Sequence, residues 1–499
     1  MKIKTTGEQV RRSGVIKFCL MIFLFFSFHS QAQTRQDVWR MGYWQAGPVF
    51  TMNFHGGVLQ IDSLNIPSPM SFYSDDAAIC DVNGNLLFYS NGIYIANALH
   101  DTMLNGGELN PGTAANIWRD HGLPNVQISI VLPDPADSNL YYMFYTSEDY
   151  SNFRGDTLLM AKIDMRLDNG LGAVVVKNYP VSADGYISGQ LTAAKHANGR
   201  DWWLICHGFN NDIYYSTLIS TDGIHPSIAQ NIGNQKSYYG QAVISPNGEM
   251  YASYDNYYNL ELMDFDRCSG LFSNYRFIDI PDSGITAGCA FSPNSKLLYV
   301  SSRVYLYQLD VTAADISTTM DTVAIWDGYG DPIGTTFELQ QLAPDHKIYI
   351  TGWGSVKHLH VINYPDSLGL ACDVQQHAIA LPGYNDGTMP NYPNYELGAK
   401  GGTVCDSLPT QTSTLLYTKE GLEVFPNPVQ SVVYISQFKS EKIIAIELVN
   451  ALGEHIQIHP LSVASDDYFQ INMSGLPSGI YEIDVRTSGR YLSKKVVKL

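Results

Sequence analysis

A repeated proline turn between two apolar runs is the feature that most constrains the fold of this chain. Residues 289–311 contain an apolar run, a Ser-Pro-Asn-Ser turn at Pro293, a second apolar run and then a run that alternates apolar and polar residues. Proline fixes φ and asparagine tolerates unusual backbone angles, so the turn predicts antiparallel strands. The phrase recurs at Pro246 and Pro344, and the three prolines lie 47 and 51 residues apart. A period of about 50 residues with one antiparallel sheet per unit predicts an all-β chain with a β-propeller.

Three more segments fit the same unit with less regular turns, namely residues 77–95, 129–165 and 191–218. Residues 38–54 are aromatic and strand-like but have no turn partner of their own. Ring closure removes exposed sheet edges, which otherwise promote aggregation. We therefore expect this fragment to pair with strands within residues 370–397, which favours seven blades over the alternative of six.

The N-terminus has the pattern of a signal peptide. Five basic residues precede an apolar run at residues 18–28, and Ser-Gln-Ala before Gln33 fits a cleavage site. Eleven apolar residues are too few to cross a bilayer, so no transmembrane span is expected in the mature chain. Residues 1–32 are assigned to the signal peptide.

The charge balance excludes one class of partner. The whole chain carries a net charge of -18, and without residues 1–32 it has 25 basic and 47 acidic residues, a net charge of -22. A chain that binds nucleic acid needs basic residues to neutralise phosphates. Nucleic acid is therefore not expected as a partner.

Six cysteines remain after the expected cleavage. Export exposes them to an oxidising compartment, but three bridges among six cysteines allow fifteen connectivities. Cys372 and Cys405 flank the end of the expected propeller, so a bridge between them would hold the last blade in place. Cys268 and Cys289 form a competing pair.

The composition changes after residue 398. Residues 399–422 contain a Gly-Gly pair, a proline and a Thr/Ser cluster, and this pattern is typical of a linker. Residues 423–499 hold five short strand-like runs separated by turns, which predicts a small Ig-like β-sandwich. The expected domains are thus the propeller at residues 33–398, the linker at 399–422 and the sandwich at 423–499.

Several ordered motifs in this last segment resemble the type A C-terminal sorting domain of the type IX secretion system. They are a Phe-Pro-Asn-Pro start, two turn glycines, a tyrosine and a basic finish: Phe425, Pro426, Asn427, Pro428, Gly453, Gly479, Tyr481, Lys494, Lys495 and Lys498. The resemblance implies that the chain crosses the periplasm of a Bacteroidota-type cell and reaches the cell surface or the medium. It also implies that the secretion machinery is a partner and that the domain is removed after export.

Residues 38–395 also resemble the secreted propeller-like (WD40-like) cargo of such bacteria. The resemblance rests on residues 85–92, 195–202 and 291–294. It implies an architecture and no chemistry.

Candidate chemical groups are sparse. His358 and His360 would share one face of a strand, a spacing that can serve a metal, with His346 or His377 as a third ligand. Two solvent-facing histidines on an outer strand are the simpler interpretation. Adjacent acids such as Asp75 and Asp76 could act as a glycosidase pair only if folding set two carboxyl groups about 5–9 Å apart. No catalytic residue, metal site or cofactor is predicted.

Aromatic residues in or near the expected loops are compatible with two interpretations, binding and packing between blades. They are Tyr238, Tyr239, Tyr254, Tyr257, Tyr258, Trp326, Tyr329 and Trp353. Their faces could stack on sugars or peptides, although tyrosine also fills space between blades. The leading hypothesis is a non-catalytic module that binds a glycan or a protein outside the cell. The alternatives are a hydrolase or lyase acting on extracellular polysaccharide, and a structural surface or adhesion component.

Overall fold

The structure is a computed structural model that describes Met1, residues 34–406 and residues 424–499. Short gaps fall at residues 44–46, 67–68, 149–153, 239, 256, 258 and 283–287, and at residues 437–442, 451–454, 457–461, 466–467 and 488–490. Apart from Met1, the predicted signal peptide lies outside the described residues, as do most of the predicted linker and Gly453. No helix in the described part of the chain is long and apolar enough to cross a membrane.

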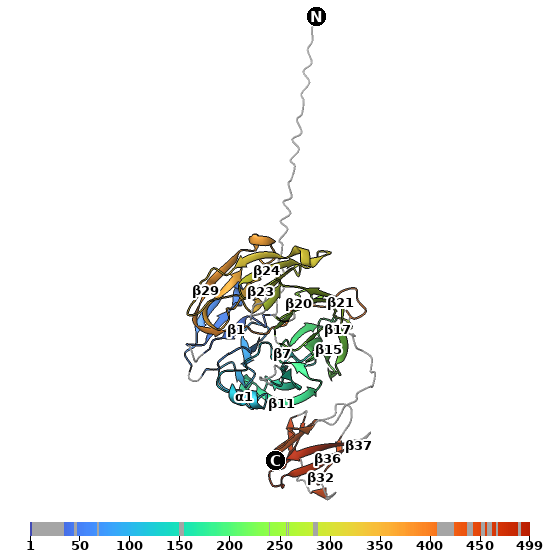
Figure 1. The fold of residues 1–499 in the computed structure, drawn as a ribbon. Coiled ribbons are helices and arrows are strands. Elements are labelled where there is room, and N and C mark those ends of the chain that lie inside the picture. Colours follow the sequence, from blue (N-terminus) through green and yellow to red (C-terminus); the bar gives the residue numbers. More distant parts are fainter. Residues whose placement is uncertain are drawn as a thin grey trace. The chain divides into compact units, whose positions relative to one another are not determined.

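Seven antiparallel sheets form a ring, which confirms the predicted propeller and its blade number (Figure 1). Blade 1 contains β1 (Val38–Met41), β2 (Phe50–Asn53) and β3 (Gln60–Ser63), and blade 2 contains β4 (Ala77–Cys80), β5 (Leu86–Ser90) and β6 (Ile95–Asn97). Blade 3 contains β7 (Ser129–Pro133), β8 (Leu140–Thr146), β10 (Leu158–Asp164) and β11 (Ala173–Ser182). Blade 4 contains β13 (Thr192–Lys195), β14 (Trp202–His207), β15 (Asn211–Ser220), β16 (Gly223–Ile224) and β17 (Ile228–Lys236).

The last three blades each have four strands in sequential order. Blade 5 contains β18 (Gln241–Ile244), β19 (Met250–Asp255), β20 (Asn259–Asp266) and β21 (Leu271–Ile278). Blade 6 contains β22 (Gly288–Phe291), β23 (Leu297–Ser302), β24 (Tyr305–Asp310) and β25 (Asp321–Ile325). Blade 7 contains β26 (Gln340–Leu342), β27 (Ile348–Ile350), β28 (Ser355–Ile362) and β29 (Val374–Asp386). Short elements accompany the ring: the ribbon of β9 (Arg154–Gly155) with β12 (Tyr186–Ile187), and α1 (Thr113–Ile117). There are also four 3-10 helices among the described residues, η2 (His55–Gly57), η3 (Asp168–Gly170), η4 (Ile316–Thr319) and η5 (Gly369–Cys372).

The repeated proline turns join the first and second strands of blades 5, 6 and 7. In blade 6 the Ser292 hydroxyl accepts a hydrogen bond from the Leu297 amide at 3.0 Å and donates one to the Asn294 side chain at 2.8 Å. Ser295, the last residue of this turn, has a φ of 60°. These turns lie at one end of the ring, which we call the turn end. The opposite end, where β19 connects to β20 and each blade passes to the next, is called the loop end.

The predicted closure of the ring is wrong in one respect. Blade 1 is a sheet of β1, β2 and β3 alone, and β29 pairs with β28 instead of with the N-terminal fragment. The fragment forms the two strands β1 and β2, and β3 supplies a third that has little apolar character. The ring closes by packing of β2 and β3 against β29 and by a backbone hydrogen bond from the Tyr43 amide to the Tyr384 carbonyl at 2.8 Å.

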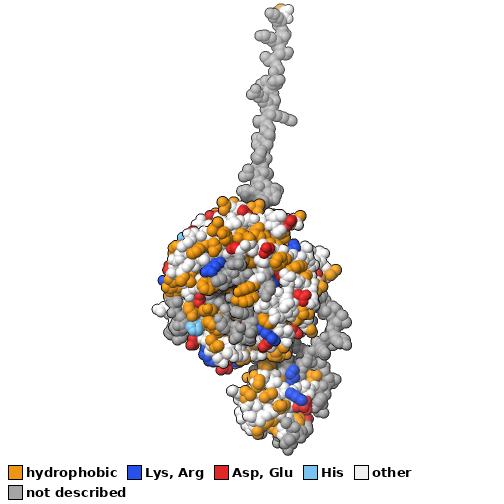
Figure 2. Space-filling model, viewed as in Figure 1, with side chains coloured by type: hydrophobic (Ala, Val, Ile, Leu, Met, Phe, Trp, Pro, Cys, Tyr) orange, Lys and Arg blue, Asp and Glu red, His pale blue; other side chains and the backbone are white. Residues whose placement is uncertain are grey.

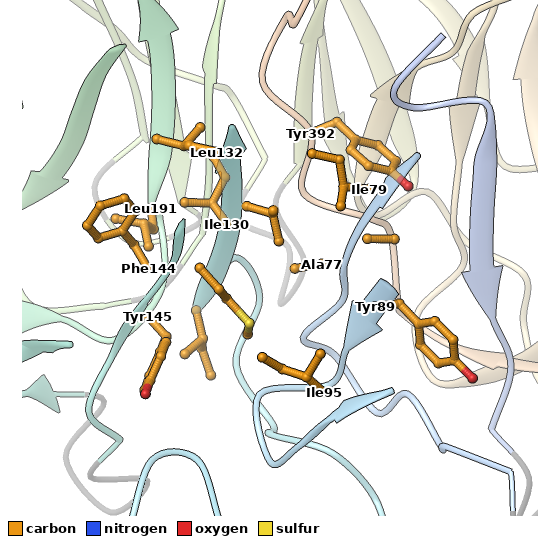
Figure 3. Close-up of a cluster of buried hydrophobic side chains, with 14 of the residues drawn as sticks. Ala77, Ile79, Tyr89, Ile95, Ile130, Leu132, Phe144, Tyr145, Leu191 and Tyr392 are labelled. Atoms are coloured by element: carbon orange, nitrogen blue, oxygen red, sulfur yellow. The ribbon is translucent and has the colours of Figure 1, made fainter. Parts of the chain in front are cut away.

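Apolar side chains between neighbouring blades form the core. Figure 3 shows the contact between blades 2 and 3, where Ala77 and Ile79 face Ile130 and Leu132. All four side chains are fully buried or nearly so. Because each blade buries its faces only against its neighbours, the ring depends on every blade being in place.

The C-terminal domain is a sandwich of two four-stranded sheets, as predicted. One sheet has the order β30 (Val424–Phe425), β31 (Val432–Ser436), β35 (Tyr468–Asn472), β34 (Ser462–Ser465). The other has the order β33 (His455–Ile456), β32 (Ile443–Asn450), β36 (Gly479–Thr487), β37 (Tyr491–Lys498). Its core includes Val433, Ile435, Leu448, Ile483 and Val496, each fully buried.

Candidate functional site

The central channel of the propeller is filled by the chain that follows β29. This segment, residues 387–398, is called the channel segment. At the loop end the Thr388 hydroxyl donates to the carbonyl oxygens of Phe72 and Tyr73 at 3.1 and 3.0 Å. At the turn end the Asn394 amide donates to the Pro246 carbonyl at 2.8 Å. The channel segment therefore passes through the ring from one end to the other.

Asn391 and two tyrosines anchor the channel segment in the ring. Asn391 donates from its side chain to the carbonyl oxygens of Ser129 and Leu191 at 2.9 and 2.8 Å. The hydroxyls of Tyr392 and Tyr395 donate to carbonyl oxygens of β1 and β7 at 2.8 and 2.7 Å. Figure 3 shows Tyr392 beside Ile79 of blade 2. A ligand cannot use this channel as a tunnel while the segment is in place.

Glutamines of the innermost strands close the channel around this segment, and the sequence analysis did not single them out. Gln127 exchanges two hydrogen bonds with the Ala242 backbone, at 2.9 and 2.8 Å. Gln241 donates to the Gln340 carbonyl at 2.6 Å and accepts from the Gln340 amide at 3.0 Å. These residues could have been found from the sequence, because several blades have a glutamine at or shortly before their first strand.

The predicted linker begins too early. The Arg267 guanidinium donates to the Gly398 carbonyl at 2.5 Å, and the Lys400 amide donates to the Ala197 carbonyl at 2.8 Å. Cys405 forms a disulfide with Cys268, in the turn between β20 and β21, with 5.7 Å between the Cα atoms. Residues 399–406 thus belong to the propeller.

The same disulfide overturns the predicted bridge between Cys372 and Cys405. Cys372 is a buried free thiol, as are Cys80, Cys206 and Cys289, so the competing pair of Cys268 with Cys289 is wrong as well. The sequence could not reveal that the channel segment carries Cys405 across the ring to blade 5.

The adjacent acids Asp75 and Asp76 lie in the protein interior. Asp75 accepts hydrogen bonds from the Ser129 amide at 3.0 Å and the Ser129 hydroxyl at 2.6 Å, and burial raises its pKa to about 6. Burial and then the charge of Asp75 raise the pKa of Asp76 well above its usual range. Both side chains are almost completely inaccessible, so this pair does not face a substrate.

An aromatic groove of about 660 Å³ lies at the loop end over blades 6 and 7. It is lined by Asp282, Ser302, Arg303, Val304, Tyr305, Trp326, Ile333, Gly334, Thr336 and Trp353. Trp326 and Trp353 are two of the predicted loop aromatics, and Trp353 is 44 % exposed. Pockets of this size, with apolar walls and a few polar groups, are typical ligand sites.

The wall of the groove is held in a fixed conformation. The loop from β25 to β26 is tied to the β23–β24 hairpin, because the Trp326 amide donates to the Val304 carbonyl at 2.8 Å and the Phe337 amide to the Arg303 carbonyl at 2.9 Å. The Trp326 indole donates to the Tyr329 carbonyl at 3.0 Å. A Cβ atom on Gly334 would lie 3.0 Å from the indole ring, so only glycine fits there without a shift. The groove is therefore formed before a ligand binds.

Histidines surround Tyr329 next to the groove. The Tyr329 ring stacks on the His377 ring with 4.0 Å between the ring centroids, and the Tyr329 hydroxyl lies 3.4 Å from His358 Nδ1. Burial lowers the pKa of His358, and it lowers the pKa of His360 to about 4. His360 is completely buried against Phe337, which corrects the expectation that both histidines face solvent.

The described residues contain no group of three histidine, cysteine or acidic side chains placed to hold a metal ion. His346 lies in the turn between β26 and β27 at the turn end, away from His358. The structure thus brings His358 and His377 together, with 6.4 Å between the ring centroids, but does not bring His346 to them.

The other predicted loop aromatics do not join the groove. Tyr238 and Tyr257 contact each other with 4.3 Å between ring centroids, and Tyr257 is exposed. Tyr254 is buried between blades 5 and 6. Tyr239 and Tyr258 lie outside the described residues. Charged side chains are scattered among apolar and uncharged polar ones on the face drawn in Figure 2.

In the C-terminal domain, the predicted motif lies against the last strand. Asn427 donates to the Lys495 carbonyl at 2.9 Å and accepts from the Val497 amide at 2.7 Å, and Phe425 stacks on Tyr434. The Tyr481 hydroxyl donates to the Pro477 carbonyl at 2.8 Å. Lys494 and Lys495 are exposed, whereas Lys498 is buried.

Comparison with known families identifies the last segment of the chain. Residues 423–499 match the family described as the secretion system C-terminal sorting domain. This type IX sorting domain places the protein outside the cell or at its surface, as predicted, and makes the secretion machinery its partner. No curated protein sequence matches the chain.

Several solved structures are similar to most of this chain at low identity and with TM-scores below 0.5. A Bacteroides fragilis protein, for which 6-phosphogluconolactonase activity is proposed, is 11% identical over 71% of this chain and 97% of its own, with a TM-score of 0.44. A Lactobacillus plantarum protein is 15% identical over 69% and 96%, with a TM-score of 0.40. Kluyveromyces lactis Hsv2 is 10% identical over 66% and 90%, with a TM-score of 0.37. The fold assignment rests on the seven sheets themselves.

Proposed function

We propose that this exported β-propeller is a non-catalytic module that binds an extracellular glycan in the aromatic groove. The observation that carries the proposal is a preformed groove with Trp326, Trp353 and Tyr305 in its walls. Aromatic faces bury the apolar face of a ligand, while a few polar groups fix its orientation. Asp282 supplies such a polar group for sugar hydroxyls.

Binding is favoured over polysaccharide cleavage by the position of the acids. A glycosidase needs two carboxyl groups on either side of an accessible bond. The channel is occupied, Asp75 and Asp76 are buried, and Asp282 is the one carboxylate among the residues that line the groove.

Affinity electrophoresis of the full chain in gels that contain soluble polysaccharides tests the proposal. We expect retardation by at least one polysaccharide, and its loss in Trp326→Ala and Trp353→Ala. Tyr364→Ala is the matched control, because Tyr364 is 63 % exposed in the β28–β29 connection at the turn end. Unretarded migration of the parent chain, equal retardation of all variants or release of reducing sugar would each contradict the proposal.

We also infer that residues 423–499 serve export and contribute nothing to binding. Their match to a sorting domain, with its own core, supports this division. In the native host, deletion of residues 423–499 should leave the propeller folded in the periplasm. Normal export of the shortened chain would contradict the inference.

A further inference from the structure

Arg303 is a cation inside the aromatic groove without an acidic partner. It lies at the tip of the β23–β24 hairpin, and its guanidinium carbon is 5.7 Å from the centroid of the Trp353 ring. No ion pair among the described residues includes Arg303. A guanidinium held on an aromatic face keeps its donors directed outward for a planar anion.

The backbone at this position is unfavourable for an arginine. Arg303 has a φ of 51°, a left-handed conformation in which glycine and asparagine are preferred. In the corresponding hairpin of blade 7, between β27 and β28, the left-handed residue is Gly354, with a φ of 75°. Structures keep such costs where the side chain has a function. Of the seventeen non-glycine residues with a positive φ in the described part of the chain, Arg303 is the one that lines the groove.

Asp282, the carboxylate that lines the same groove, is already used by its neighbours. It accepts a hydrogen bond from the Tyr307 hydroxyl at 2.8 Å and another from the Ser302 hydroxyl. These bonds hold Asp282 at the wall, where its remaining lone pairs can accept from a sugar hydroxyl. Because Asp282 is bonded to Tyr307 and Ser302 and forms no ion pair with Arg303, the Arg303 guanidinium is available to an anion on the ligand.

We propose that the groove selects an anionic sugar residue, whose carboxylate or sulfate binds the Arg303 guanidinium while its ring contacts Trp326 and Tyr305. This inference rests on the proposed glycan-binding function and makes it specific for acidic polysaccharide. A bidentate pair of this kind is charge-assisted and short. With a net charge of -18, the chain gives no general attraction for a polyanion, so a local cation has to provide the selectivity.

Calorimetric titration of the full chain tests the proposal with three oligosaccharides of equal length. One carries carboxylates (oligogalacturonide), one carries sulfates (sulfated galactan) and one is neutral (galactan). We expect at least one anionic probe to bind at least about tenfold more tightly than the neutral one, because a charge-assisted pair contributes more than the 1.4 kcal/mol that corresponds to a tenfold change. The preferred anionic probe then identifies the group.

The variant Arg303→Asn separates binding from folding, because asparagine tolerates the left-handed conformation and has no charge. It should melt no lower than the parent chain, lose about tenfold or more affinity for the anionic probe and lose clearly less affinity for the neutral probe. Arg303→Lys keeps the charge without the planar fork, so its affinity should fall between the two.

Neutral and anionic probes of equal affinity, or an Arg303→Asn variant with unchanged affinity for the anionic probe, would overturn the role of Arg303 and leave the glycan-binding function intact. Failure of the parent chain to bind any of the three probes or any polysaccharide in the gels would overturn the proposed function itself.

Discussion

At the turn end of the propeller, short connections satisfy their own polar groups, whereas at the loop end several polar groups remain without a protein partner. In blade 5 the Ser245 hydroxyl accepts from the Met250 amide at 2.9 Å, and Asn247 accepts from the Glu249 amide at 3.0 Å. At the loop end of blades 6 and 7, buried oxygens of Thr335, Thr336 and Thr351 have no protein partner among the described residues.

The two ends also differ in how the chain is held. The disulfide between Cys268 and Cys405 and the hydrogen bond from Lys400 to Ala197 fix the channel segment at the turn end. The loop end carries the aromatic groove and the left-handed Arg303. Buried polar groups without a partner are costly, so these connections of the loop end contribute less to stability than those of the turn end. The comparison supports the proposal that the loop end binds a ligand, while the connections of the turn end stabilise the ring.

The largest expected effect is the loss of the channel segment. A chain that ends at Asp386 should fail to fold, because it loses the buried Tyr392 and Tyr395, each contributing about 1.5–3 kcal/mol by burial alone, and the hydrogen bonds of Asn391. A chain that ends at Asp406 should melt as one cooperative unit. Circular dichroism during heating distinguishes the two, and a cooperative melt of the shorter chain would contradict the role given to the channel segment.

Removal of the disulfide should come next. Cys405→Ser removes a bridge between two cysteines that are 137 residues apart in the sequence. The chain-entropy model gives a loss of about 4–5 kcal/mol in the free energy of unfolding for a loop of this length. Denaturant midpoints with and without reductant measure the effect. The control is Cys372→Ala, a buried thiol without a bridge, whose stability should still respond to reductant. An unaffected Cys405→Ser variant would show that the turn end does not depend on this bond.

At the loop end, a buried ion pair between blades 4 and 5 provides the third test. Lys236 is fully buried, with its Nζ 2.9 Å from Glu261 Oε2 and 2.8 Å from the Ser253 hydroxyl. Lys236→Met should cost about 3–5 kcal/mol, because it leaves an unpaired buried carboxylate. Lys236→Met with Glu261→Gln should be less destabilised in urea than the single variant. An equal loss of stability in the single and the double variant would contradict the stabilising role of this ion pair.

The ion pair between Lys236 and Glu261 also makes stability depend on pH. Burial raises the pKa of Glu261, but the charge of Lys236 and several hydrogen bonds outweigh burial, and the net pKa is lowered. Because the folded protein holds this proton less tightly than the unfolded chain, the stabilisation is present at neutral pH and is lost as the pH falls below about 4.3.

The smallest expected effect on stability comes from Glu338, whose pKa is shifted in the opposite direction to that of Glu261. Burial and then the charge of Asp386 raise the pKa of Glu338 well above its usual range, and its Oε2 atom is buried without a protein partner. The folded state therefore holds this proton more tightly, and stability decreases as the pH rises from about 4.3 towards the folded pKa. Glu338→Gln should stabilise the protein at pH 7.5 more than at pH 4.5. Equal shifts in the melting temperature at both pH values would contradict this.

Several parts of the fold could be predicted from local pattern alone. The turns at Pro246, Pro293 and Pro344 use proline and asparagine or aspartate, whose backbone preferences act within four residues, and blades 5–7 follow from them. In the C-terminal domain, five strands were predicted from short apolar runs. Their predicted bounds lie within a few residues of the observed bounds of β31, β32, β35, β36 and β37. Local hydrogen bonding and side-chain alternation determine such elements wherever they occur in a chain.

Tertiary structure alone decided which distant segments meet. The pairing of Cys405 with Cys268 depends on the passage of residues 387–398 through the channel, which has no regular secondary structure and no periodic pattern. Trp326, Trp353 and Arg303 come from three separate connections, and only the closed ring places them in one groove. The sequence by itself determined the repeat, the turns and the sorting domain, because these depend on neighbouring residues. The site required contacts between residues far apart in the chain, which the packing of seven blades provides.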